Sequence, residues 1–470
     1  MQMKKTLIPL LCAGGVVVGL FWSSPAYAQR KSVAEELIEI LEADGKISSN
    51  KADELRQRAK VESEAREAGV EAFRRDPVKA VTDDKNLSWL KRLSFSGDIR
   101  WRTEGFYQDE TNARTRERIR LRLGVKAKIS DELEATIRLA TGNVNDPIST
   151  NQSLGGAFSK KSFNLDQAYI KITPGATFGL QEWPWRPLVL SLGKMSNTLW
   201  SPSAGLSSEM IFDGDLTPEG TAQTFTLFQA SEGVMRQFQL NTIQWMVTEA
   251  SRSAEAMAWG GQFVGTFQVV PDVGITLGIG DYYFSHRSAI AQERNSNSEL
   301  KITNGVILED GTIVKGGRSF SPSSSNPIRD YLSGFNIFNA GFQLDINTGY
   351  PKWPLSFMLD YALNTDAVGS DDSAYWAGVG LGQTKDPGDF SIAAVWARTE
   401  TEAVMSMFSY SDFGRDGGTN VQGPFLALNY QLFPNLTLTA KNHFVSYIDR
   451  PSGVSNATVN RLQLDAQMKF

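Results

Sequence analysis

The chain has 470 residues and a net charge of −5 at pH 7, and it is rich in glycine and aromatic residues although its mean hydropathy is only −0.26. The acidic balance excludes a general nucleic-acid-binding protein, which would be basic, and two histidines argue against a histidine-rich metal site. We therefore expect no metal, no cofactor and no nucleic-acid partner.

Residues 1–28 are predicted to be a secretory signal peptide. Lys4 and Lys5 precede an apolar stretch over residues 6–22, and Ala26-Tyr-Ala offers the small residues that a signal peptidase reads. An uncleaved anchor is the alternative, but the stretch is short for a spanning helix. Cleavage would remove the only cysteine, Cys12, and would leave 45 basic and 52 acidic residues, a charge of −7. The exported chain would then contain no disulfide.

Residues 29–80 are predicted to form a small helical segment, followed by a linker over residues 81–91. Apolar residues between Val33 and Leu41 repeat at helical spacing, Asp44-Gly-Lys ends the first helix, and a highly charged second helix extends to about Arg75. The segment is coiled-coil-like and too polar to form a large core by itself. Binding to peptidoglycan is one role that such a segment could have.

From residue 92 to residue 470 the pattern changes to a period of two, which predicts an all-β domain. No apolar run after the signal peptide is long enough for a transmembrane helix. We predict sixteen strands. They are expected near residues 93–102, 118–129, 133–139, 164–173, 186–194, 220–230, 235–247, 256–269, 274–285, 332–347, 354–364, 373–384, 388–400, 422–432, 435–447 and 458–470.

The connections between these strands alternate between short turns and long polar loops. The long loops include residues 143–162, 195–219 and 286–331, while residues 174–185 are a long connection on the side of the short turns. Short periplasmic turns and long external loops are typical of an outer-membrane β-barrel. An even strand number places both ends of the barrel on one side, so we expect the helical segment in the periplasm.

A sheet that crosses lipid must close, because an open edge would leave unpaired N–H and C=O groups. Sixteen strands leave an aqueous channel, whereas eight are filled by side chains. Aromatic residues take part in the alternating pattern, and many of them lie near predicted strand ends. We interpret these as girdles at the two membrane interfaces. The alternating aromatic residues are Trp101, Trp245, Trp259, Tyr282, Phe284, Tyr361, Trp376, Trp396, Tyr430 and Phe444. A soluble β-sandwich array or a β-helix is the alternative fold.

The last strand, which begins at Arg461, ends in Phe470 and is similar to the signal recognised by the barrel-assembly machinery. Further stretches with a family resemblance are LSFSGDIR from Leu93, RERIRLRLG from Arg116, LDQAYI from Leu165, LGKM from Leu192, FDGDLTPEG from Phe212 and NHF from Asn442. In these stretches the chain resembles the putative porin family of Gram-negative outer membranes. The resemblance implies passive diffusion of small hydrophilic solutes through the outer membrane, often by a homotrimer, but it names no solute.

Basic side chains on the wet faces of the first two strands are the candidate pore-lining residues. They are Arg100, Arg102, Arg116, Arg118, Arg120, Arg122 and Lys126. A basic wall would concentrate anions in the channel. The alternative is that these residues pair with neighbouring carboxylates such as Asp98 and Glu134, which would give a structural ladder without selectivity.

The loop over residues 195–219 is the candidate constriction. Its acidic residues are Glu209, Asp213, Asp215 and Glu219. We expect it to fold inward and oppose the basic wall, and a plain surface loop is the alternative. Asp213 and Asp215 have the spacing that starts a Ca²⁺ loop but lack its later ligands.

An enzyme and an envelope tether are the competing functions. His443 is out of phase with the apolar face, so it should point inward rather than serve a lipase-like site at the rim. A tether or adhesin would use the barrel as a plugged anchor. The solute, the ion selectivity, the pore diameter, the oligomeric state and the strand count to within two stay open, as does occlusion by loops 195–219 or 286–331.

Overall fold

The computed structural model describes residues 33–75, 88–109, 112–249, 255–413, 418–451, 453, 455 and 458–470. The predicted signal peptide and most of the predicted linker lie outside these residues. The chain divides into two units, residues 1–90 and 91–470. Within the described residues, no helix is both long and apolar enough to cross a membrane.

The first unit contains a helical hairpin. Helix α1 covers Val33–Ala43 and helix α2 covers Ser49–Arg75, and Gly45 makes the turn between them at φ +67°. Ile38 and Ala52 are buried in the hairpin, and Arg56 pairs with Glu42 at 2.5 Å. Most other side chains are polar, so the hairpin buries little apolar surface. A short 3₁₀ helix, η1 (Ser88–Arg92), precedes the sheet.

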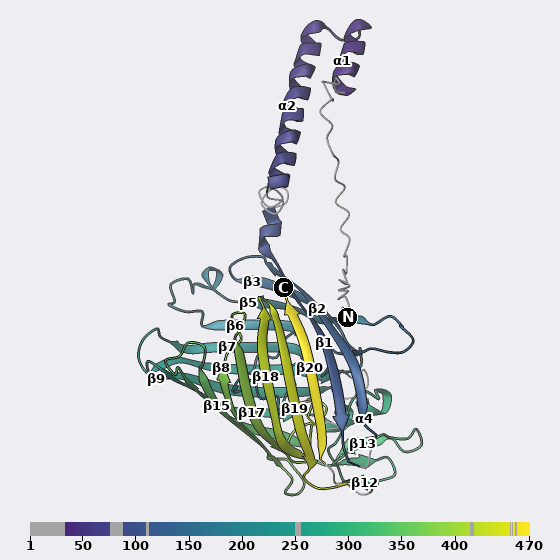
Figure 1. Ribbon diagram of the computed structural model, residues 1–470, viewed down its shortest axis with the longest axis vertical. Coiled ribbons are helices and arrows are strands. Elements are labelled where there is room, and N and C mark those ends of the chain that lie inside the picture. The colour runs from purple at the N-terminus through teal and green to yellow at the C-terminus, as the bar shows by residue number, and fades with distance from the viewer. Residues whose placement is uncertain are drawn as a thin grey trace, which may run out of the picture. The chain divides into compact units, whose positions relative to one another are not determined.

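The second unit is a closed antiparallel β-barrel, and the prediction of sixteen strands is confirmed among the described residues. Strand β1 pairs with both β2 and β20, and Gly97 exchanges backbone hydrogen bonds with Phe470, so no edge is left open (Figure 1). The strands are β1 (Leu93–Tyr107), β2 (Arg114–Lys128), β3 (Leu133–Thr141), β5 (Phe163–Ile172), β6 (Leu188–Lys194), β7 (Glu219–Gln229), β8 (Met235–Thr248), β9 (Ala256–Val270), β10 (Val273–Phe284), β14 (Phe335–Ile346), β15 (Leu355–Asn364), β16 (Ser373–Gly382), β17 (Phe390–Thr399), β18 (Val421–Phe433), β19 (Leu436–Tyr447) and β20 (Val459–Lys469). A two-residue strand, β4 (Gln152–Ser153), adds to β2.

Side chains alternate between an apolar outer face and a polar inner face along these strands. On β1, Ile99 and Trp101 are exposed on the outside, whereas Asp98, Arg102 and Glu104 are buried inside. This pattern is required because one face meets hydrocarbon and the other meets water or polar loops.

Part of the predicted aromatic girdle is wrong. Trp101, Trp259, Tyr361, Trp396 and Tyr430 are exposed on the outer face, as girdle residues must be. The other face carries Trp245, Tyr282, Phe284 and Trp376, which are all buried inside the barrel. Their physical role is to pack against loops that fold inward.

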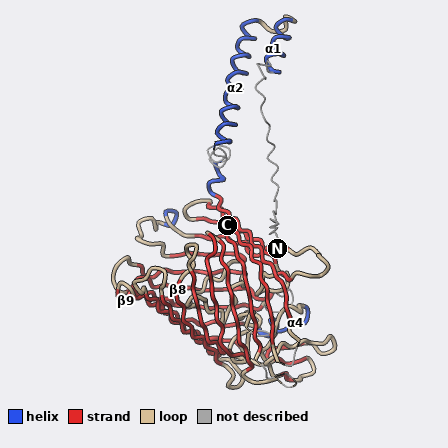
Figure 2. Tube along the Cα trace, viewed as in Figure 1, coloured by secondary structure: helices blue, strands red, loops and turns tan. Residues whose placement is uncertain are grey.

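The loop predicted over residues 286–331 has its own structure. It contains α4 (Arg287–Ser296) and a small sheet of β11 (Val306–Leu308), β12 (Ile313–Val314) and β13 (Ile328–Tyr331). Ile290, Ile302 and Tyr331 are completely buried in one continuous core with the inner face of the barrel. Figure 2 shows this mixture of helix, strand and loop near one end of the strands.

Candidate functional site

The connection of residues 195–218 lies against the inner face of the barrel. Gln262 of β9 accepts a hydrogen bond from the Trp200 backbone N–H at 2.8 Å and donates one to its carbonyl oxygen. The Trp200 ring sits over two glycines, because a Cβ at Gly278 or Gly341 would lie 2.6 or 2.8 Å from it. Farther round the wall, the Ser208 hydroxyl donates to Asp360 at 2.5 Å.

A second connection, residues 400–420, also folds inward and binds the first. Asp213 N–H donates to the Phe408 carbonyl at 2.8 Å, and Tyr410 N–H donates to that of Glu209 at 3.1 Å. Tyr410 packs edge-on against Trp376 with ring centroids 5.4 Å apart. His443 is fully buried beside Tyr410, with 3.0 Å between Nε2 and the hydroxyl oxygen. This part of the lumen, along β16–β19, is therefore filled by aromatic side chains.

The predicted basic residues of β1 and β2 lie on the inner face, and most of them form ion pairs. Asp98 accepts hydrogen bonds from Arg120 at 2.9 Å and from Arg122 at 2.6 Å. Arg102 binds Asp465 of β20 at 2.7 Å. It also reaches Asp412 of the second inward connection at 2.9 Å.

Glu104 is the centre of a second ion-pair group. It is completely buried and contacts both Arg116 and Arg461. Arg461 in turn donates to Asp412 at 2.7 Å. This geometry is that of the structural ladder considered from the sequence, although most of its carboxylates differ from those expected.

Arg100 and Arg118 are paired more weakly than the other inner-face arginines. Arg100 donates to the side-chain oxygen of Asn151 at 2.6 Å, and its nearest carboxylate, Asp465, lies at 3.8 Å. Arg118 donates to the Ser149 hydroxyl at 3.3 Å and lies 4.0 Å from Glu104. The Nε atoms of both are buried and have no hydrogen-bond partner among the described residues.

Within the described residues, seven arginines and five carboxylates form this ion-paired network, which we call the arginine wall. Its arginines are Arg100, Arg102, Arg116, Arg118, Arg120, Arg122 and Arg461, and its carboxylates are Asp98, Glu104, Asp215, Asp412 and Asp465. The network therefore carries more positive than negative groups. Lys126 lies outside it, half exposed and 3.4 Å from Glu134.

Asp215 connects the inward connection to the arginine wall. Its carboxyl lies 3.5 Å from Arg122 and accepts a hydrogen bond from the Thr150 hydroxyl at 3.0 Å. Burial opposes its charged form, but Arg120, Arg122 and Arg100 outweigh burial and lower the pKa of Asp215. Asp215 is therefore the charged acid of this connection.

The other predicted acids of the connection behave differently. Burial raises the pKa of Asp213, with Glu209 and Asp215 adding to the effect, and burial also raises the pKa of Glu209. Glu219 was expected in the loop but is the first residue of β7, where it pairs with Lys194 at 2.9 Å. The hydrogen-bonding pattern of the sheet starts at that residue, so the loop ends one residue earlier than predicted.

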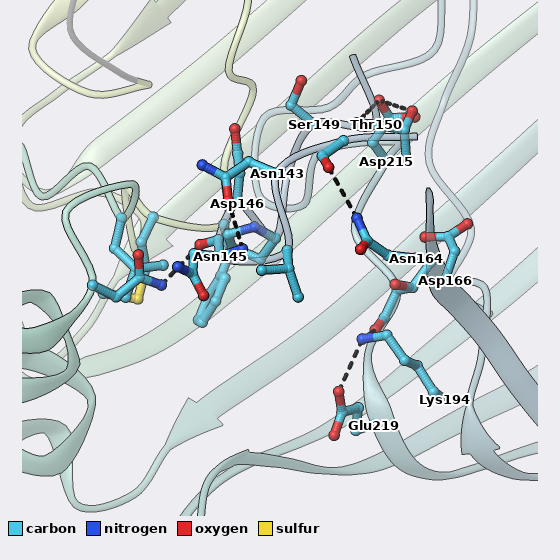
Figure 3. A pocket seen from close by; sticks show the side chains of 18 of the residues that line it. Asn143, Asn145, Asp146, Ser149, Thr150, Asn164, Asp166, Lys194, Asp215 and Glu219 are labelled. Atoms are coloured by element: carbon cyan, nitrogen blue, oxygen red, sulfur yellow. Dashed lines mark hydrogen bonds and ion pairs between the residues drawn. The ribbon is translucent and has the colours of Figure 1, made fainter. Parts of the chain in front are cut away.

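Two cavities adjoin the 143–151 segment and share Asn143, Asp146 and Ser149 in their linings. The larger, about 700 Å³, is bordered by the basic side chains of Arg114, Arg116, Arg118, Lys301 and Arg461. The smaller, about 320 Å³, is lined by Asp166, Asp215, Glu219 and several asparagines (Figure 3). Burial raises the pKa of Asp146 to about 6.

Several residues of the site were not predicted as such. Arg461 and Asp465 alternate on the wet face of the last strand, so the period of two could have identified them. Glu104 follows the same rule on β1. Asp412 lies in a loop, where no periodic signal exists. Among the described residues, no group of three or more His, Cys, Asp or Glu side chains is placed to hold a metal ion.

Comparisons with known proteins match the chain to a family model described as putative porin, over residues 106–310 and 324–470. The high-pH structure of OprB of Pseudomonas putida is similar to this chain, with 12% sequence identity and a TM-score of 0.50. The match covers 83% of this chain and 97% of the OprB chain. OmpF of Salmonella typhi, in complex with daunomycin, is 8% identical with a TM-score of 0.47, covering 80% and 97%. No curated protein matches the chain.

Proposed function

The chain belongs to the putative porin family and is an outer-membrane channel for solute diffusion, and we propose that this channel prefers small anions, which pass along the arginine wall. The observation that carries the proposal is the incomplete pairing of Arg100 and Arg118. Family and fold point to a channel rather than an enzyme.

The position of the aqueous path follows from what fills the rest of the lumen. Trp376, Phe413 and Phe425 are almost completely buried together along β16–β18, and Tyr282 and Trp245 are buried against Phe212 on β8–β10. Water and solute are excluded from close-packed aromatic clusters. The larger cavity instead borders β1, β2 and β20, so the path runs on that side.

The sign of the selectivity follows from the charges that remain after ion pairing. A guanidinium group that is partly desolvated and whose nearest carboxylate lies at the limit of ion-pair distance attracts a passing anion more strongly than a fully paired one. Arg100 and Arg118 are such groups, and Asn151 and Ser149 beside them provide neutral hydrogen-bonding groups. The paired arginines contribute little to the net electric field in the channel, because each lies close to a carboxylate. For these arginines the structural ladder, the alternative given from the sequence, applies.

Residues 195–218 narrow this path in our proposal. Asp215 is hydrogen-bonded by Thr150 and lies 3.5 Å from Arg122, so it holds this connection against the arginine wall. Its carboxylate offsets part of the positive charge of the wall. Loss of Asp215 should therefore widen the path and strengthen its preference for anions.

The helical hairpin is proposed to lie in the periplasm. The support is the even number of strands, which brings the entry of β1 and the end of β20 to the side of the short turns. Binding of the hairpin to peptidoglycan and insertion of the barrel by the assembly machinery belong to the same proposal.

Removing the two weakly paired charges tests the anion preference. Arg100→Gln with Arg118→Gln should lower the ratio of anion to cation permeability several-fold, because both side chains stay polar but lose their charge. The measurement is the reversal potential of single channels in a planar bilayer under a salt gradient. Arg398→Gln is the matched control, since Arg398 lies on β17 outside the arginine wall, beside Glu400 and Gln422. An unchanged reversal potential in the double variant, or an equal shift in the control, would contradict the proposal.

A further inference from the structure

The larger cavity beside the arginine wall has the size of a site for a small molecule. It is lined by the inner face of β1, β2 and β20 and by parts of three connections, residues 143–153, 286–331 and 400–420. Its volume is about 700 Å³, and small-molecule sites usually have roughly 300–1,000 Å³. A molecule held in this cavity can therefore contact the barrel wall and the connections at the same time.

The lining of the larger cavity carries more basic than acidic side chains. The five basic residues are Arg114, Arg116, Arg118, Lys301 and Arg461, and the three acidic residues are Asp146, Glu299 and Asp412. Among the described residues, neither Arg114 nor Lys301 has a carboxylate partner. Arg114 contacts the Phe106 ring, and Lys301 donates to the Ser298 carbonyl at 3.4 Å. The charges of these two side chains are therefore available to an anionic ligand.

An aromatic ring positions guanidinium groups at one side of the cavity. Phe106 lines the cavity near the end of β1. The guanidinium carbons of Arg114, Arg116 and Arg461 lie 5.8, 5.2 and 5.1 Å from the centre of its ring. Attraction to an aromatic face orients a guanidinium group without neutralising its charge, as an ion pair would. Arg114 therefore keeps its N–H donors for a carboxylate, which it can bind through two parallel hydrogen bonds.

Neutral polar side chains form much of the remaining lining. Six serines, three asparagines and two glutamines line the cavity, against only three apolar residues, Phe106, Ile148 and Val459. Within the described part of the chain, the side chains of Gln152, Ser153 and Ser319 form no hydrogen bond. Hydroxyl and amide groups both donate and accept hydrogen bonds. The lining therefore suits a ligand with several hydroxyl groups better than an apolar one.

We propose that the larger cavity binds a hydroxylated carboxylate, which is a solute with one carboxylate group and several hydroxyl groups. This inference rests on the proposed anion preference and names the class of solute. The carboxylate is bound by Arg114 and Lys301, and the hydroxyl groups are bound by Gln152, Ser153 and Ser319. An apolar carboxylate uses only the charged part of this site and a neutral polyol uses only the uncharged part, so both bind more weakly.

Three probes with six carbon atoms each separate recognition of charge from recognition of hydroxyl groups. Gluconate has a carboxylate and hydroxyl groups, hexanoate has the carboxylate alone, and sorbitol has hydroxyl groups alone. Each is added to single channels of the full chain in a planar bilayer in potassium chloride, and the interruptions of the current are timed. Gluconate is expected to cause interruptions several-fold longer than those of hexanoate or sorbitol. Equal interruptions by gluconate and hexanoate would overturn the proposal.

Removing the two available charges tests where the carboxylate binds. Arg114→Gln with Lys301→Gln should shorten the gluconate interruptions several-fold. The matched control is Lys160→Gln with Lys161→Gln, which removes two charges from exposed residues between β3 and β5 that do not line the cavity. An equal shortening in the control, or unchanged interruptions in the first variant, would contradict the assigned site.

A second variant tests the hydroxyl groups and stays informative if the first does not fold. Ser153→Ala with Ser319→Ala preserves every charge, and it should bring the gluconate interruptions several-fold closer to those of hexanoate. An unchanged ratio of the two would count against the proposal. A chloride-preferring channel on which gluconate and hexanoate act alike would overturn this inference alone. A potassium-preferring channel would overturn the proposed function and, with it, this inference.

Discussion

Asp146 lines both cavities, and its ionisation should change near neutral pH. Burial raises its pKa to about 6, and Glu299 adds to the effect. The group is therefore charged above about pH 6 and neutral below it. Because Asp146 and Arg118 both line the larger cavity, protonation of Asp146 leaves the cationic side chains of that cavity less compensated.

The anion preference should therefore increase as pH falls from about 7 to about 5. Reversal potentials recorded across this range measure the effect. Asp146→Asn should show the higher preference already at neutral pH and a flatter pH dependence. Asp310→Asn is the control, because the backbone hydrogen bond from Thr312 lowers the pKa of Asp310 and keeps it charged throughout. Parallel pH profiles for the parent and Asp146→Asn would contradict the assignment.

Glu104 is the residue on which the stability of the arginine wall should depend most. It is completely buried and is bound by Arg116 and Arg461. Replacing it with glutamine removes the carboxylate that pairs with Arg116 and leaves Arg461 with Asp412 alone, which should cost about 3 kcal/mol of unfolding free energy.

Urea unfolding of the barrel in lipid vesicles measures this loss. Glu134→Gln is the comparison, since Glu134 pairs with a half-exposed lysine, Lys126, and should cost less than about 1 kcal/mol. Equal effects of the two substitutions would mean that the buried ion pairs do not stabilise the wall.

At the scale of elements, the connection of residues 195–218 should set the width of the channel. Trp200 fixes it by occupying the space above Gly278 and Gly341. Trp200→Ala should loosen the connection and increase single-channel conductance. Trp183→Ala provides the control, because Trp183 is half exposed in the connection between β5 and β6. A conductance unchanged by Trp200→Ala would show that this contact does not control the width.

The strands were predictable because each has one face in water or polar loops and one face against lipid, which gives a period of two in the sequence. Where both faces of a strand are apolar, the period of two does not tell which set of alternating residues faces the lipid. Trp245, Tyr282 and Trp376 alternate like girdle residues but pack against inward loops. Only the tertiary position of those loops decides between the two faces.

For the candidate site, the sequence predicted the face on which the arginines lie but not most of their ion-pair partners. Alternation placed the arginines of β1 and β2 on the wet face, but their partners lie far away in the sequence. Asp412 and Asp465 meet Arg102 across a separation of more than 300 residues. The degree of pairing, and therefore the distinction between Arg100 or Arg118 and the other arginines, depends on such contacts.

For the whole molecule, closure of sixteen strands determines that a lumen exists, and the inward connections determine how much of it stays open. The two cavities lie beside the 143–151 segment, and the larger borders the arginine wall. A channel displaced toward one side of the barrel is therefore consistent with both the sixteen-stranded fold and the buried aromatic core.

The most direct test of this account is the reversal potential of the full chain in a planar bilayer under a potassium chloride gradient. The account predicts a stable single-channel conductance and a reversal potential with the sign of chloride preference. A reversal potential with the sign of potassium preference would contradict the role given to Arg100 and Arg118. Absence of conductance from correctly folded protein would contradict the channel itself and would favour the plugged-anchor alternative.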